Sequence, residues 1–168
     1  MNVRALERAD LDDALQLWQR TEHLGRVPRE EVEGVLDHDP GLVLAAEWEG
    51  RLVGVVLGTF DGRRGWIQRL AVVPELRRTG VARALVDELE RRLRARGCVQ
   101  VNLLVFDDNE AGRAFWEHLG YEGTERLVMY RRRIDDPDGD RAADPVSGGP
   151  EDRGARCPGS ASRPPDAC

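Results

Sequence analysis

The hexapeptide RRTGVA, residues 77–82, constrains this chain most, because it joins a strand pattern directly to a helix pattern. The segment before it, WIQRLAVVPEL, is rich in apolar and β-branched residues, and Pro74 ends that strand because proline cannot donate to a sheet ladder. The segment after it, ALVDELERRLRARG, has apolar residues at helical spacing and stops at Gly97. A strand that turns into a helix at a glycine presents unpaired helix N–H groups, which favour an anion, typically a phosphate.

The same hexapeptide also fits a plainer interpretation, an ordinary glycine-containing helix start with exposed arginines. Two common phosphate motifs are excluded by form, because no G-K-[ST] follows and no G-x-G-x-x-G is present. Gly80 gives the turn its backbone freedom, and Arg77 and Arg78 add positive charge near the helix start. The neighbouring sequence has to decide between the two interpretations.

Strand and helix patterns alternate through the rest of the chain. Apolar alternation and turn residues predict strands over residues 3–7, 42–48, 52–60, 66–73, 99–106, 121–125 and 127–132. Helical spacing predicts helices over residues 11–20, 28–38, 81–96 and 110–119, with Asp10 as the cap of the first. This order predicts an α+β fold in which a mixed, mostly antiparallel central sheet is flanked by helices.

The last part of the chain differs in composition from the rest. Residues 135–168 contain 6 of the 9 prolines and no aromatic residue, and such a segment cannot bury enough apolar surface to fold. We therefore expect one folded domain over residues 1–134 and a disordered Pro/Gly/Asp-rich tail over residues 135–168.

The charge and the cysteine content limit which partners and which cellular compartment we expect for this chain. Residues 1–134 hold 21 Arg and 23 acidic residues, so the folded part lacks the basic excess that a nucleic-acid-binding domain needs. The three cysteines form no spaced framework, the N-terminus has no apolar signal segment, and no run reaches membrane-spanning length. These features predict a cytoplasmic protein without nucleic-acid, membrane or metal partners.

Two motifs in order carry a resemblance to a known family. The hexapeptide matches R/Q-x-x-G-x-G/A, the pyrophosphate loop of the GNAT (GCN5-related) N-acetyltransferases, and DDNEAGRAFWEHLGYE, residues 107–122, resembles their second signature. The likeness spans roughly residues 2–133 and is greatest to the RimI-related bacterial YpeA group. It implies a GNAT-like acyl-CoA N-acyltransferase fold and an acetyl-CoA-dependent N-acetyltransferase. In such an enzyme a primary amine attacks directly through a tetrahedral intermediate.

The resemblance also implies where acetyl-CoA lies. Its pantetheine arm would lie along the backbone of Leu70, Ala71 and Val72, with the Val72 N–H holding the thioester oxygen as charge develops there. Arg83 and Asn109 would contact the cofactor from two helix starts. The pyrophosphate would sit on the amides of Arg77, Arg78, Thr79, Gly80, Val81 and Ala82.

The chain departs from the family at the acid and the base. Trp116 stands where many members have a tyrosine that protonates the leaving thiolate, and an indole cannot do that; it can still shape the acyl pocket. Leu104 stands where RimI proteins have a glutamate base. The replacement candidates are Glu47, otherwise an edge-facing polar residue, and Asp61, otherwise simple Asp-Gly turn chemistry. Asp61 and Arg64, together with His23 in a loop, are the expected acceptor contacts.

Two further functions compete with the enzyme. A catalytically silent acyl-CoA-binding regulatory protein is favoured by Trp116 and Leu104, and a nucleotide-phosphate-binding module is the weaker alternative. The acceptor is left open between a small amine and a protein N-terminus, and acids in the predicted acceptor loops would suit a cationic amine. The oligomeric state is open as well, although members of the family are often homodimers.

Overall fold

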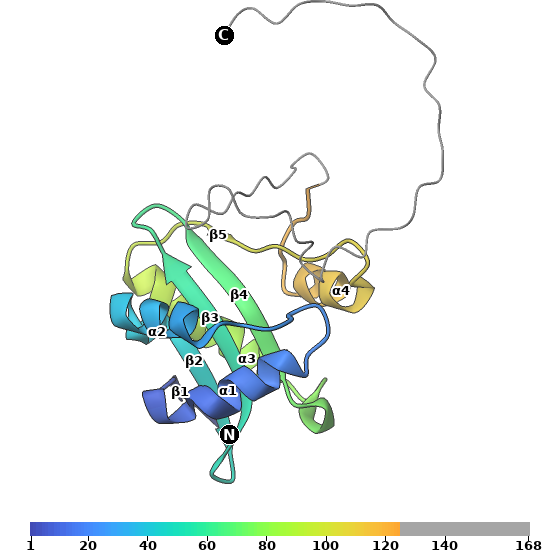
Figure 1. Cartoon of the computed structure of the whole chain (residues 1–168). Coiled ribbons are helices and arrows are strands. Elements are labelled where there is room, and N and C mark those ends of the chain that lie inside the picture. Colours follow the sequence, from blue (N-terminus) through green and yellow to red (C-terminus); the bar gives the residue numbers. More distant parts are fainter. Residues whose placement is uncertain (125–168) are drawn as a thin grey trace, which may run out of the picture. The chain divides into compact units, whose positions relative to one another are not determined.

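The computed structural model describes residues 1–124 and centres on one five-stranded sheet (Figure 1). The strands lie in the order β1-β2-β3-β4-β5, and only the β4–β5 pair is parallel. Their bounds are β1 Asn2–Ala5, β2 Val43–Trp48, β3 Arg51–Phe60, β4 Gly65–Val72 and β5 Val101–Asn102. The predicted fold, a mixed and mostly antiparallel sheet flanked by helices, is confirmed.

Helices cover both faces of this sheet. Figure 1 shows α1 and α2 in front of the sheet and α3 behind it, while α4 follows the chain that leaves β5. The helices are α1 Leu11–Gln19, α2 Arg29–His38, α3 Val81–Ala95 and α4 Glu110–His118, with short 3-10 turns η1 Arg8–Asp10, η2 Pro40–Leu42 and η3 Pro74–Leu76. Within residues 1–124, no helix has the length and apolar content needed to cross a membrane.

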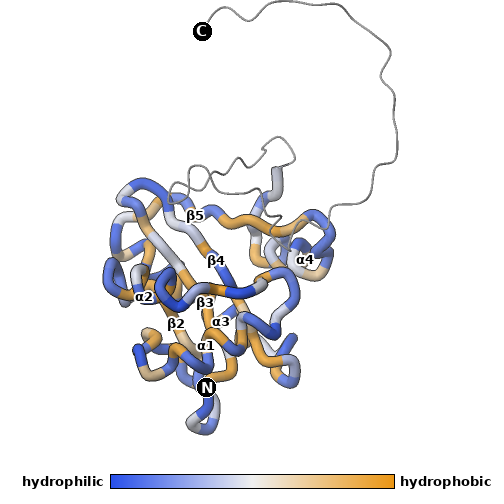
Figure 2. Tube along the Cα trace, viewed as in Figure 1, coloured by the Kyte–Doolittle hydropathy of each residue, from blue (hydrophilic) through white to orange (hydrophobic). Residues whose placement is uncertain are grey.

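Alternation along the strands builds two apolar layers. Successive side chains point to opposite faces, so Val55 and Leu57 of β3 pack under α1 and α2, whereas Val56 between them packs under α3. Figure 2 shows the apolar colour following the central strands and the inner sides of the helices. None of the described polar or charged residues is buried, so both layers are purely hydrophobic.

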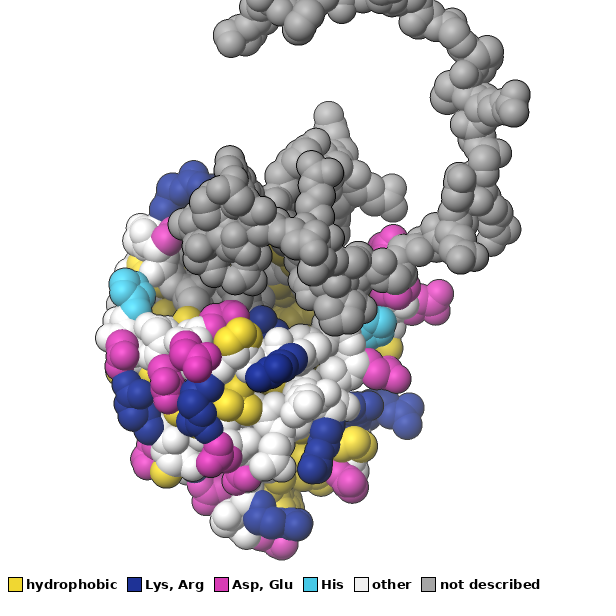
Figure 3. All heavy atoms as spheres, in the orientation of Figure 1, with side chains coloured by type: hydrophobic (Ala, Val, Ile, Leu, Met, Phe, Trp, Pro, Cys, Tyr) yellow, Lys and Arg dark blue, Asp and Glu magenta, His cyan; other side chains and the backbone are white. Residues whose placement is uncertain are grey.

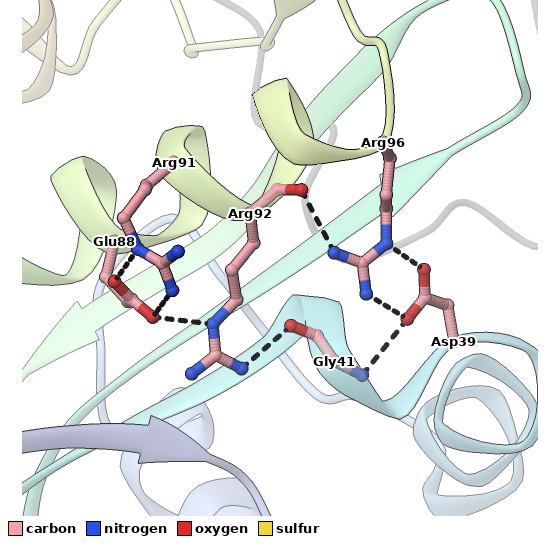
Figure 4. Close-up of polar contacts among 6 residues, drawn as sticks. All are labelled: Asp39, Gly41, Glu88, Arg91, Arg92 and Arg96. Atoms are coloured by element: carbon pink, nitrogen blue, oxygen red, sulfur yellow. Dashed lines mark hydrogen bonds and ion pairs between the residues drawn. The ribbon is translucent and has the colours of Figure 1, made fainter.

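Helix α3 packs closely on the sheet and is tied to η2 at its C-terminal half. A Cβ added to Gly58 of β3 would lie 2.5 Å from Leu89 Cδ1, so glycine permits the close approach of α3. Figure 4 shows how the polar edge of α3 reaches η2, with Arg92 Nη1 donating to the Gly41 carbonyl at 3.0 Å. Arg96 forms a two-point ion pair with Asp39 at 2.7 and 2.8 Å.

Asp10 does not cap α1, contrary to the sequence-based prediction. Its side chain makes no capping bond there, because its carboxylate accepts from Arg4 Nη1 at 2.6 Å and Nη2 at 2.9 Å and from the Glu7 N–H at 2.8 Å. The turn η1 precedes α1 directly, so Asp10 closes η1 with Glu7 instead. Arg4 on β1 thus binds the carboxylate that the local sequence assigned to the helix cap.

The predicted buried strand over residues 99–106 is also wrong in extent. Only Val101 and Asn102 pair with β4, opposite Gly65 and Trp66, and Leu104 is 68% exposed. The chain leaves β4 after two residues and therefore loses its ladder. Residues 121–124 form no strand, and the predicted strand over 127–132 and the tail over 135–168 lie outside the described residues.

Candidate active site

The open edge of β4 is the central feature of the site. β5 pairs with β4 only at Gly65 and Trp66, and the chain then runs away from β4 toward α4 (Figure 1). Among residues 1–124, the C-terminal half of β4 therefore has β3 on one side and no strand on the other. Strand edges of this kind accept an extended ligand as an added strand.

The backbone direction at this edge follows from one hydrogen bond. The Val73 N–H donates to the Val53 carbonyl of the β3 side at 2.9 Å. Because successive N–H groups of a strand alternate in direction, the Val72 N–H points away from β3 and toward the open edge. The Val72 carbonyl shares that direction, and Arg77 Nε contacts it at 3.4 Å. The edge thus offers both a donor and an acceptor at Val72.

A bulge precedes these residues. Val55 pairs with Ala71 and Leu57 pairs with Gln68, so Arg69 and Leu70 together face a single residue of β3. Arg69 adopts a φ of 51°, which a residue with a Cβ rarely takes. The bulge and the open edge occupy the same half of β4.

The N-terminus of α3 lies directly beyond this edge. Gly80 has a φ of 95°, and no side chain caps the helix, so the N–H groups of Val81, Ala82 and Arg83 have no partner within residues 1–124. The loop before it is exposed, and Arg78 is held at a φ of 61°. These amides and the positive end of the helix dipole suit an anion such as a pyrophosphate.

The loop between α1 and α2 covers the gap between β4 and the chain that follows β5. On one side, Arg69 Nη1 donates to the Leu24 carbonyl at 3.0 Å. On the other side, the His23 ring lies 5.9 Å from the Phe106 ring, and His23 Nδ1 lies 3.6 Å from Asp108 Oδ1. His23 also has a positive φ of 63°. The structure therefore brings His23 to the open edge, with a carboxylate beside it.

Glu47 does not lie at the open edge. It sits on β2, with β3 between it and β4, and its register partner is Leu52. Its carboxylate accepts from Arg4 Nε at 2.9 Å on the α1 side of the sheet, where it lines a cavity of about 540 Å³. The expectation that this side chain faces the gap is wrong, because Arg4 holds it elsewhere.

Asp61 is also far from the open edge. It lies in the turn before Gly65, at the end of β4 where β5 pairs, and the strand from Gly65 to Val72 is about 23 Å long at ~3.3 Å per residue. Its carboxylate accepts from the backbone N–H groups of Arg64 at 2.6 Å and Arg63 at 2.7 Å, which hold its pKa below the usual value. Asp61 and Arg64 thus form a local turn, and a carboxylate so stabilised is a weak base.

Trp116 belongs to an aromatic cluster behind the gap. Its ring meets Phe115 at 5.0 Å and Tyr121 at 5.1 Å, both edge-on. The Tyr121 hydroxyl donates to Glu90 at 2.7 Å, and burial together with that carboxylate raises the pKa of Tyr121. The cluster presents no readily donated proton. Asn109 caps α4, because its side-chain oxygen accepts from the Gly112 N–H at 2.8 Å.

Sequence reasoning missed two contacts of the site. The indole N–H of Trp18 donates to the Arg69 carbonyl at the bulge. Asp108 reaches His23 although 85 positions separate them in the chain. No local pattern signals either contact, since the first depends on α1 packing on β4 and the second on the α1–α2 loop reaching Asp108.

Comparison with known proteins shows the family. A model of the acetyltransferase (GNAT) family matches residues 8–121. Acetyltransferase ECA0875 of Pectobacterium atrosepticum is 38% identical over 138 residues, which cover 81% of this chain and 98% of that protein.

Solved structures share the fold at lower identity. The aminoglycoside antibiotic 6'-N-acetyltransferase AAC(6')-IG from Acinetobacter haemolyticus is 22% identical with a TM-score of 0.66, covering 80% of this chain and 100% of that one. The ribosomal-protein-S18-alanine N-acetyltransferase from Escherichia coli is 24% identical with a TM-score of 0.61, covering 73% and 79%.

Proposed function

The chain belongs to the acetyltransferase (GNAT) family, and we propose that it transfers an acetyl group from acetyl-CoA to a primary amine by direct attack of that amine. The observation that carries the proposal is the open edge of β4 lying beside the uncapped N-terminus of α3. One feature suits an extended amide-bearing arm, and the other suits the phosphates attached to it. Acetyl-CoA is the acetyl donor of this family.

The residues present fit this donor. The backbone of Leu70, Ala71 and Val72 would pair with the pantetheine arm, because the polar groups of Val72 face the open edge. Arg83 would add charge from the first turn of α3, and Asn109 would approach from the start of α4. The amides that would hold the pyrophosphate belong to Arg78, Thr79, Gly80, Val81 and Ala82. The expected Arg77 amide is not available, because its N–H donates to the Pro74 carbonyl at 3.2 Å.

The chain contributes positioning and a preset donor. Acetyl-CoA supplies the activated acetyl thioester. The Val72 N–H is fixed by the β3 ladder in the direction where negative charge would develop on the acetyl oxygen, so it needs no reorganisation. Holding the amine beside that group supplies a large part of the acceleration in such transfers.

His23 replaces Glu47 and Asp61 as the proposed proton acceptor. It lies over the open edge, contacts Phe106, and has Asp108 near its Nδ1, which can orient the ring. A histidine placed in this way can take the proton of the attacking amine directly or through one water. Trp116 has no proton to give, so the thiolate would be protonated by solvent.

The acceptor we propose is a cationic amine, either a small molecule or a peptide N-terminus. Acidic residues occur on both sides of the gap, Glu22 and Glu31 near the α1–α2 loop and Asp108 beyond Phe106. Figure 3 shows acidic side chains interspersed with arginines over the face formed by α1 and α2, so the attraction would be local.

The test follows CoA release from acetyl-CoA with a thiol reagent in the presence of aminoglycosides, polyamines, amino acids and peptides with free N-termini. Turnover with one class would establish the acceptor. Tight acetyl-CoA binding without turnover would favour the alternative, a catalytically silent acyl-CoA-binding regulatory protein. Failure to bind acetyl-CoA at all would reject the proposed site.

The proposed role of His23 has a matched control in the chain. We expect His23→Gln to lower kcat at least about 100-fold, the usual scale for loss of a general base, with acetyl-CoA affinity unchanged. His38 ends α2 and is exposed, so His38→Gln should leave kcat within about twofold. Equal activity of the two variants would assign the proton to solvent.

A further inference from the structure

The bulge of β4 is held by a tryptophan from α1. Trp18 has no exposed surface, and its indole N–H, the only polar group of the side chain, donates to the Arg69 carbonyl. A buried N–H without a partner is costly, so Trp18 and the bulge depend on one another. The other residues of this layer are hydrophobic, so a purely apolar side chain would suit the same place except for the hydrogen bond to Arg69.

Arg69 needs such support. Its φ of 51° is unfavourable for a residue with a Cβ, and the bulge leaves Arg69 and Leu70 opposite Val56 alone. Strained backbone of this kind persists where the surroundings fix it, and it gathers at functional sites. Of the residues in the described range with a Cβ and positive φ, His23, Arg69 and Arg78 all lie around the open edge, while Glu49 sits in the β2–β3 turn.

The hydrogen bond from Trp18 also orients the peptide unit between Arg69 and Leu70. A trans peptide is planar, so the Arg69 carbonyl and the Leu70 N–H point in opposite directions. Trp18 fixes the carbonyl toward α1, and the Leu70 N–H must therefore point away from α1. A carbonyl that accepts a hydrogen bond also polarises its own peptide unit, which makes the N–H a better donor.

We propose that Trp18 is a positioning residue for acetyl transfer, and that it orients the Leu70 N–H through the Arg69 carbonyl. This inference rests on the proposed function, because it treats the Leu70 backbone as part of the acetyl-CoA site. Trp18 touches neither the donor nor the acceptor in this arrangement. Its effect passes through a single peptide plane and ends at one amide.

The test compares Trp18→Phe with Trp66→Phe. Trp66 lies on the same strand, is partly buried, and has no partner for its indole N–H within residues 1–124, so it controls for loss of an indole. The first readout is the backbone amide resonance of Leu70 in the ¹⁵N-labelled full chain, without and with acetyl-CoA. The second is kcat beside the affinity for CoA.

We expect Trp18→Phe to shift the free Leu70 amide resonance and abolish its response to acetyl-CoA, while Trp66→Phe does neither. A misplaced Leu70 amide would shift the acetyl thioester relative to the Val72 N–H, so kcat should fall about tenfold, less than for outright loss of the Val72 donor. The affinity for CoA, which the amides at the start of α3 also hold, should stay within about twofold. A Leu70 resonance in Trp18→Phe that coincides with wild type would overturn the proposal.

The readouts separate this inference from the proposed function. If the wild-type chain shows no turnover, the proposed acetyltransferase activity is rejected. The Leu70 resonance would still show whether Trp18 orients that amide. If Trp18→Phe does not fold, 3-benzothienylalanine at position 18 replaces the N–H with sulfur at almost equal volume. The same resonance and the same comparison with Trp66→Phe then apply.

Discussion

The two ends of α3 are built in opposite ways. The N-terminal end starts at Gly80 without a cap, and its first-turn amides face solvent beside exposed arginines. The C-terminal half is tied to η2 by Arg92 and Arg96, as Figure 4 shows. An uncapped helix start is unfavourable unless something else holds the helix. The polar contacts that fasten α3 to η2 therefore lie at its C-terminal half, while the first-turn amides at its other end have no partner within residues 1–124.

Gly80→Asp should break this division most strongly. An aspartate at the cap position can accept from the first-turn amides itself, so it would compete with a pyrophosphate and repel it. Losing about 3 kcal/mol of charge-assisted hydrogen bonds lowers affinity about 100-fold. Isothermal titration with CoA measures the loss. The melting temperature should fall as well, because a residue with a Cβ is strained at the φ of 95° that Gly80 adopts.

Gly97→Asp is the matched control at the other end of α3. Gly97 has a φ of 84° and, like Gly80, open space where a Cβ would go. A carboxylate at a helix C-terminus is unfavourable by about 0.5 kcal/mol, and a Cβ at this positive φ costs about 1 kcal/mol more, so this variant should be less stable than wild type. Its CoA affinity should equal that of wild type. Equal CoA affinities for the two variants would remove the pyrophosphate from the start of α3.

Asp39→Asn tests the stabilising half. The Asp39 carboxylate pairs with Arg96 through both oxygens and accepts from the Gly41 N–H, so the loss should cost about 1–1.5 kcal/mol of unfolding free energy. Asp87→Asn, which breaks an exposed pair with Arg83 at 3.6 Å, should cost less than about 0.5 kcal/mol. Urea unfolding measures both, and a weakened CoA affinity in Asp39→Asn would contradict the separation of the two halves.

Glu88 gives the same half a pH dependence. Hydrogen bonds from Arg91 and Arg92 lower the pKa of Glu88 to about 2, from an ordinary value of 4.5. Since the folded pKa is the lower one, the stabilisation is complete above about pH 4.5 and is lost as the pH falls toward 2. The unfolding free energy of wild type should exceed that of Glu88→Gln by about 1 kcal/mol at pH 6, and this difference should vanish near pH 2. A difference that stays constant with pH would assign the effect to shape alone.

The contrast between the ends of α3 also marks what the sequence could predict. Gly80 and Gly97 flank the helix and its apolar residues recur at helical spacing, so its bounds were predictable. The R-x-x-G-x-A motif is the basis of the proposal that its N-terminal end binds the cofactor. These signals are local. The antiparallel pairing of β2 with β3 follows in the same way from the short Glu49-Gly50 turn between them.

Contacts between distant segments were not predictable in this way. Glu47 looked free to face the gap, but Arg4 on a neighbouring strand holds it. Residues 99–106 carry a strand pattern, yet the divergence of β5 from β4 decides how much of it pairs. The hydrogen bond from Trp18 to Arg69 joins residues 51 positions apart. It also depends on the positive φ of Arg69, which an arginine in the sequence does not indicate.

The smallest expected effect belongs to Arg83, which points from the binding end of α3 into solvent. Its pair with Asp87 at 3.6 Å is exposed, so Arg83→Gln should change stability by less than about 0.5 kcal/mol. At low ionic strength it should weaken CoA binding about threefold, since one exposed charge near a phosphate is worth about 0.6 kcal/mol, and at high salt the difference should disappear. Arg94→Gln removes an equally exposed arginine near the other end of the helix and should leave CoA affinity unchanged at both salt concentrations. If the two variants weaken CoA binding alike, the arginines act through net charge rather than through position on the helix.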